Sequence, residues 1–144
     1  MADETGRAII KAFYTKITGD ATMKSVLGTP VSLYRIMAPQ DPDMPYLVHR
    51  LSLGAPLLHG SHTYLLDVWD YNSSPSRVDS AVDRLKVLLH FWRFETASDE
   101  IGAGIVKWFS GGYIPTDANN VFHFATQWDV RFGSARDIGN IVEV

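Results

Sequence analysis

Apolar and polar side chains alternate along residues 121–132 with almost no interruption. One face of this segment carries Phe122, Phe124, Thr126, Trp128, Val130 and Phe132, and the other carries His123, Ala125, Gln127, Asp129 and Arg131. Apart from Thr126, the first face is entirely apolar. A repeat of two residues predicts a β-strand with one buried face.

Residues 63–71 show a different pattern. Their apolar side chains divide between the two faces of a strand, with Tyr64, Leu66 and Val68 on one and Leu65, Trp69 and Tyr71 on the other. A strand that is apolar on both faces has to be covered on both. The chain offers only two helices of useful length, which is enough for one side. We therefore expect another copy of the chain to cover the second face, with Leu65, Trp69 and Tyr71 as the candidate subunit interface.

Helical spacing appears in three places. Ile9, Phe13 and Ile17 form one apolar stripe, which predicts a helix over residues 5–17 capped by Asp3 or Thr5. A short helix is expected over residues 21–27, with Asp20 as its cap and Gly28 as its end. A third helix, to about residue 90, is expected to take Ser74 as its cap and Pro75 as its first residue.

Further strands are predicted at residues 31–37, 46–53 and 105–110, with a loop at 111–120 in which Gly111-Gly112-Tyr113 forms a turn. Residues 91–104 either extend the third helix or form an edge strand. This order predicts an α+β fold, with a mainly antiparallel sheet and two main helices packed on one face. Residues 1–144 are expected to form a single domain, with a carboxyl tail at 132–144 on the surface or on a neighbouring copy.

Composition narrows the function. The chain of 144 residues has a net charge of −3 and no run of lysine or arginine, so tight binding to a nucleic acid backbone is not expected. No cysteine is present, which excludes disulfides, thiolate metal sites and a cysteine nucleophile. No secretory signal and no membrane span are predicted, and we expect a soluble protein made in the cytoplasm.

Candidate catalytic and metal-binding residues are few. His59 and His62 are three residues apart in a predicted loop, without the third ligand that zinc normally needs. His123 falls on the polar face of its strand, and Asp67 and Asp70 point to opposite faces. A small metal-dependent or acid–base hydrolase using His59, His62, His123 and Asp67 stays open as one hypothesis. The favoured reading assigns no catalytic, metal-binding or cofactor-binding residue.

One short motif carries a family resemblance. Ala38-Pro39-Gln40, followed by Met44-Pro45-Tyr46-Leu47-Val48, comes after an amino-terminal helix and opens a strand. A strand, a helix and a last strand ending Trp128-Asp129-Val130-Arg131-Phe132 follow. In this order of elements the chain resembles the tail-completion and tail-terminator proteins of long-tailed bacteriophages.

The resemblance implies a tail-terminator-like fold and a non-enzymatic virion protein in the neck region of the tail, assembled in the host cytoplasm. Such a protein forms a ring of identical subunits, expected to be a hexamer, at the head-proximal end of the tail tube. It contacts the major tail-tube protein and the head connector proteins, and DNA passes through its lumen without specific binding. A head–tail connector or a minor tail protein is the alternative within the same class.

Overall fold

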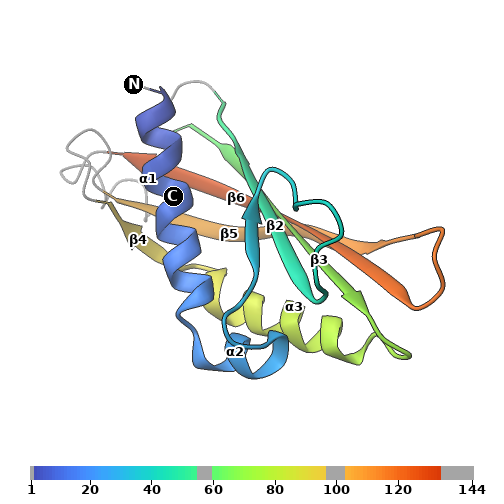
Figure 1. Cartoon of the computed structure of the whole chain (residues 1–144). Helices are drawn as coiled ribbons and strands as arrows, with labels where there is room; N and C mark the ends of the chain where they lie inside the picture. The colour runs from blue at the N-terminus through green and yellow to red at the C-terminus, as the bar shows by residue number, and fades with distance from the viewer. Residues whose placement is uncertain (1, 55–59, 97–102, 134–144) are drawn as a thin grey trace.

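The computed structural model describes residues 2–54, 60–96 and 103–133. Within them lie three helices and one six-stranded sheet in the order β1-β2-β3-β6-β5-β4 (Figure 1). The helices are α1 (Ala2–Thr18), α2 (Ala21–Leu27) and α3 (Ser76–Leu89). The strands are β1 (Leu33–Arg35), β2 (Tyr46–Ser52), β3 (His62–Tyr71), β4 (Arg93–Glu95), β5 (Ala103–Ile114) and β6 (Val121–Gly133). Among the strand pairs of the described residues, only β1–β2 is parallel, so the predicted α+β class with a mainly antiparallel sheet is confirmed.

The helices and one face of the sheet share a single hydrophobic core. The predicted stripe of α1 is fully buried there, and its Phe13 ring stacks on Tyr64 of β3 with 3.7 Å between ring centroids. The core residues of β3 and β6 are even-numbered, as are the residues on the faces of Tyr64 and Phe122 in the sequence pattern. Burying a large apolar side chain contributes about 1.5–3 kcal/mol, so this core supplies most of the stability of the fold.

Helix α2 is held by the residue expected to cap it. The Asp20 carboxylate accepts a hydrogen bond from the backbone amide of Met23 (2.9 Å), and Gly28 ends the helix with a φ of 100°. The same carboxylate receives two hydrogen bonds from Arg84 of α3, at 2.9 and 2.7 Å. The Arg84 hydrogen bonds keep the pKa of Asp20 below its usual value. One side chain therefore caps α2 and ties it to α3.

Several element boundaries differ from those expected. Helix α1 begins at Ala2, so Asp3 and Thr5 lie inside it instead of preceding it. Pro75 precedes the first residue of α3, Ser76, instead of being part of the helix. The strand expected at residues 31–37 is reduced to the three residues of β1, and residues 93–95 form the edge strand that was one of two options.

The largest correction concerns β5, because Gly111-Gly112-Tyr113 is not a turn. β5 continues to Ile114, with Gly112 opposite Ala125 and Ile114 opposite His123 of β6. Two glycines weaken a strand when judged locally. Here the long alternating β6 supplies a partner for each of these residues, and the tertiary pairing overrides the local preference.

Polar side chains inside the core are hydrogen-bonded. The hydroxyl of Thr126, the one polar residue on the buried face of β6, donates to the carbonyl of Leu66 (2.6 Å) and accepts from Nε1 of Trp128 (2.8 Å). The buried His49 Nδ1 lies 2.6 Å from the hydroxyl of Tyr64. Burial, with a smaller effect from Arg35, lowers the pKa of His49 to about 4.

The buried His49 predicts a pH-dependent stability. Its pKa is lower in the folded chain than in the unfolded chain, so the unfolded state takes up a proton first as the pH falls below about 6.5. The stability is complete above that pH and is lost as the pH falls towards 4. At pH 5 we expect a loss of about 2 kcal/mol relative to pH 7 from this residue.

Chemical denaturation of the wild type and of His49→Gln at the two pH values measures this contribution. Glutamine still reaches the Tyr64 hydroxyl but does not titrate in this range. The free-energy difference between the two proteins should shrink at pH 5, and an unchanged difference would contradict the assignment.

Candidate subunit interface

The sheet has one face that the described helices leave uncovered. We call it the open face; on β3 it carries Thr63, Leu65, Asp67, Trp69 and Tyr71. The opposite face of β3 is fully buried in the core, whereas these five side chains are half-buried or exposed. The division of β3 into two faces is therefore as the sequence predicts.

The apolar part of the open face is a row of rings that crosses four strands. We call Tyr34, Tyr46, Trp69 and His123 the aromatic row. Ring centroids lie 5.9 Å apart between Tyr34 and Tyr46, 6.1 Å between Tyr46 and Trp69, and 3.8 Å between Trp69 and His123. Burial and the nearby Tyr34 raise the pKa of Tyr46, so its phenol is neutral at ordinary pH. On the adjacent strand β5, Ile114 extends the apolar surface past His123.

His123 is held in place by two contacts. It stacks on Trp69, and its Nε2 lies 3.1 Å from the carboxylate of Asp67. These contacts leave the residue only 9% exposed, although no described helix lies over it. A stacked ring with a fixed hydrogen-bond partner loses little freedom when another surface packs on it, which suits an interface.

A strained turn places a further apolar side chain beside the row. Ile36 has a φ of 73°, and the amide of Met37 donates to the carbonyl of Arg35 (2.9 Å), which closes a γ-turn around Ile36. Such a backbone costs about 1–3 kcal/mol for a β-branched residue. Ile36 is 61% exposed and borders a hollow of about 80 Å³ together with Leu65 and Asp67. Strain that presents an apolar side chain to solvent points to a functional surface.

The three predicted interface residues all lie on the open face. Leu65 and Trp69 are half-buried among neighbouring strands, and Tyr71 is 61% exposed at the end of β3. Their role in an interface stays a prediction. The sequence did not identify Tyr34 or Tyr46 as their neighbours, because only the pairing of β1, β2 and β3 brings these rings together.

The histidines considered for a hydrolase do not come together. His62 is buried on the helix side of the sheet, where it stacks on Phe132 and accepts a hydrogen bond from the amide of Gly54 (2.8 Å). His123 lies on the open face, opposite a residue of β3 seven positions from His62. His59 lies outside the described residues. Within residues 2–54, 60–96 and 103–133, no group of three or more His, Asp or Glu side chains could hold a metal ion.

Asp67 and Asp70 point to opposite faces, as predicted. Asp70 is fully buried and receives two hydrogen bonds from Arg77, at 2.9 and 2.6 Å, which connect the end of β3 to the start of α3. Asp67 contacts His123 on the open face. In the part of the chain that the structure describes, no helix has the length and apolar character needed to cross a membrane.

Comparison with known proteins gives a structural match. No protein-family model matches the chain, and no curated protein matches it by sequence. A chain of the solved structure described as the virion of a native gene transfer agent particle has the same fold, with a TM-score of 0.70. The match covers 88% of this chain and 96% of that chain at 12% sequence identity. The similarity therefore establishes a shared fold over nearly the whole of both chains.

Adjacent leucines on β3 allow a matched test of the two faces. Leu66→Asp buries a charge in the core and should cost at least about 4 kcal/mol, enough to unfold a marginally stable domain. Leu65→Asp places the same charge on the open face, where the folded monomer should lose about 1 kcal/mol or less. Self-association should nevertheless be lost, since the charge would be desolvated in the interface.

Circular dichroism with thermal unfolding measures folding, and light scattering measures association. Trp69→Ala should behave like Leu65→Asp, losing association more than stability. Equal loss of folded protein in the Leu65 and Leu66 variants would refute the assignment of the open face to an interface.

Proposed function

We propose that the chain is a non-enzymatic structural component of a phage-like virion that assembles into a ring. The observation that carries the proposal is the fold shared with a chain of the gene transfer agent virion, over 88% of this chain. The sequence resemblance to tail-completion and tail-terminator proteins supports the same class. We assign the ring to the head-proximal end of a tail tube, where it ends tube polymerisation and joins the tail to the head connector.

The open face supports assembly into a ring of identical copies. Its aromatic row and Ile36 present apolar surface that the described helices leave uncovered, and a second copy can bury it. A closed ring repeats one heterologous interface, in which the open face of each subunit would meet a different surface of the next subunit. We propose six subunits. A lumen formed by a chain of net charge −3 would let DNA pass without retaining it.

The proposed partners follow from this position in the virion. One side of the ring would contact the major tail-tube protein, and the other would contact the head connector proteins. A head–tail connector or a minor tail protein would use the same fold and the same self-association. The order of neighbouring genes distinguishes these roles, because a terminator gene is expected just before the gene for the major tail-tube protein.

The proposal predicts a ring in the purified protein. Light scattering is expected to give a mass several times that of one chain, and negative-stain microscopy is expected to show closed rings. Trp69→Ala serves as the control, because it should remain folded but yield far fewer rings. A wild-type protein that is strictly monomeric, both alone and with its tail tube, would contradict the ring.

The terminator role makes a separate genetic prediction. Disruption of the gene should yield tail tubes of uncontrolled length that do not join heads, because nothing ends polymerisation. Electron microscopy of lysates measures tube length directly, and the wild-type gene supplied in trans should restore it. Tubes of normal length that fail to join heads would favour the connector alternative.

A further inference from the structure

The backbone groups on the outer edge of β5 are paired as far as Trp108 and unpaired with any described strand after it. Up to that residue its backbone groups are paired, first with β4 and then through Val106, whose amide donates to the carbonyl of Trp92 (3.0 Å). The amide of Trp108 donates to Nδ1 of His90 (3.0 Å). No described strand pairs with this edge beyond Ile105. Residues 110–114 therefore form an edge that is open on the side away from β6.

The backbone of this open edge is accessible. In an antiparallel ladder the residues bonded to one neighbour alternate with residues whose groups point the other way. The amides of Val106 and Trp108 point outward, and the register shift between Trp108 and Ser110 moves the alternation by one residue. Gly111 and Tyr113 therefore present their N–H and C=O groups away from β6. Both residues are exposed, and a Cβ added at Gly112 would meet no atom within 4 Å.

The edge also carries no charged side chain and no proline. Exposed edge strands are normally blocked by charged side chains or proline. Residues 110–114 carry neither, and Pro115 comes only where the strand has ended. Tyr113 is fixed by its hydroxyl, which hydrogen-bonds to the carboxylate of Asp79 on α3, so its backbone is held ready for a partner.

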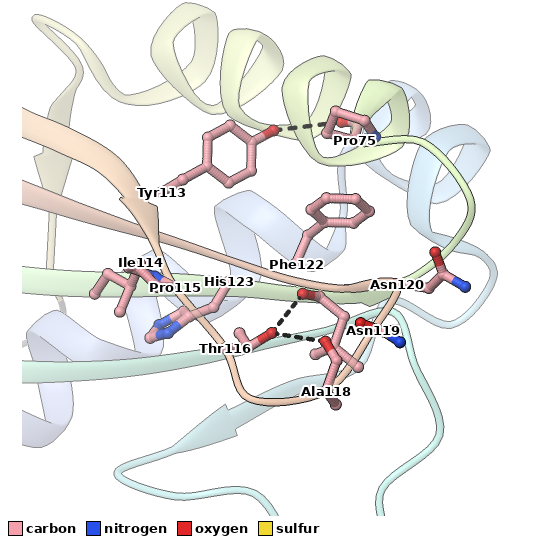
Figure 2. Close-up of a pocket in the computed structure, with 11 residues that line it drawn as sticks. Pro75, Tyr113, Ile114, Pro115, Thr116, Ala118, Asn119, Asn120, Phe122 and His123 are labelled. Atoms are coloured by element: carbon pink, nitrogen blue, oxygen red, sulfur yellow. Dashed lines mark hydrogen bonds between the residues drawn. The ribbon is translucent and has the colours of Figure 1, made fainter.

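A hollow of about 450 Å³ lies at the end of this edge (Figure 2). Figure 2 shows the rings of Tyr113 and Phe122 on the side of Pro75, while Ile114 and His123 lie on the other side of the hairpin. In Figure 1 the β5–β6 hairpin projects beyond the helices. An unpaired edge beside a partly apolar hollow is the arrangement with which proteins bind an extended segment as an added strand.

We infer that residues 138–144 of a second copy of this chain bind as a strand along Gly111–Tyr113. This rests on the proposed ring of identical copies and specifies one of its contacts. The segment contains Ile138, Ile141, Val142 and Val144, no proline, and an uncharged stretch at 138–142 that matches the uncharged edge. Its alternate aliphatic side chains suit the apolar side of the hollow.

A second copy fits this role better than the same chain. β6 ends at Gly133, which lies opposite Ala103 at the far end of β5 from Ile114. The direct path from there along the outer edge of β5 is occupied by β4. A neighbour in a ring can approach the projecting hairpin from outside without crossing β4.

Disulfide trapping tests the contact, because the natural chain contains no cysteine. Gly112→Cys is introduced into a tagged full-length chain, and either Ile141→Cys or Val142→Cys into an untagged one, so that both faces of the added strand are sampled. After mixing and mild oxidation, we expect a disulfide-linked pair of tagged and untagged chains on a non-reducing gel. Ser25→Cys, exposed on α2, replaces Gly112→Cys as the matched control and should give no such pair.

Each result is decisive. A trapped mixed pair in the absence of the control pair supports the inference. Chains that carry both cysteines but link only within themselves would show that the tail binds its own subunit, which overturns the inference. A mass of several chains in light scattering, without any trapped pair, would overturn this contact but not the proposed ring. A monomer without a trapped pair would overturn both.

Removal of residues 138–144 gives a second, independent measurement. The dissociation constant for self-association should rise by about tenfold or more, which corresponds to about 1.4 kcal/mol of lost contact. The thermal stability of the monomer should stay unchanged. Unchanged association would overturn the inference even if the ring forms.

Discussion

The fold depends on the pairing of β3 with β6. All ten residues of β3 pair with residues 121–130 of β6, from His62 opposite Val130 to Tyr71 opposite Val121. These two strands come from distant parts of the chain and form the centre of the sheet. Their register also fixes the faces, because a slip of one residue would exchange core and surface side chains along one of the two strands. The hydrogen bond from Thr126 to the carbonyl of Leu66 favours the observed register from inside the core.

This register determines which side chains lie on each face of the sheet. On the helix side it gathers the fully buried rings of Tyr64, Trp128 and Phe132. On the open face the same register sets Trp69 opposite His123, which joins the aromatic row to β6. The surface proposed for assembly is thus produced by the same pairing that builds the core, and the two cannot vary independently.

Much of the fold could be predicted from local patterns. The long alternation in β6, the stripe of α1 and the cap at Asp20 were visible in the sequence, because each depends on neighbours close along the chain. The strand order and the parallel β1–β2 pair were not, since both depend on contacts between distant residues. The turn at Ile36 could not be predicted either, because a β-branched residue such as isoleucine rarely adopts a positive φ.

The irregularity in β5 between Trp108 and Ser110 has a consequence for this part of the chain. One extra residue there changes which side of the sheet every later side chain of β5 faces. It directs Tyr113 towards Asp79 of α3 and Ile114 towards His123. If β5 alternated regularly from Trp108 at its present length, Tyr113 would lie on the open face and Ile114 on the face towards α3. Phe109 has no partner in the register of β5 with β6, so related chains that lack one residue at this point should form a regular strand with the same later pairs.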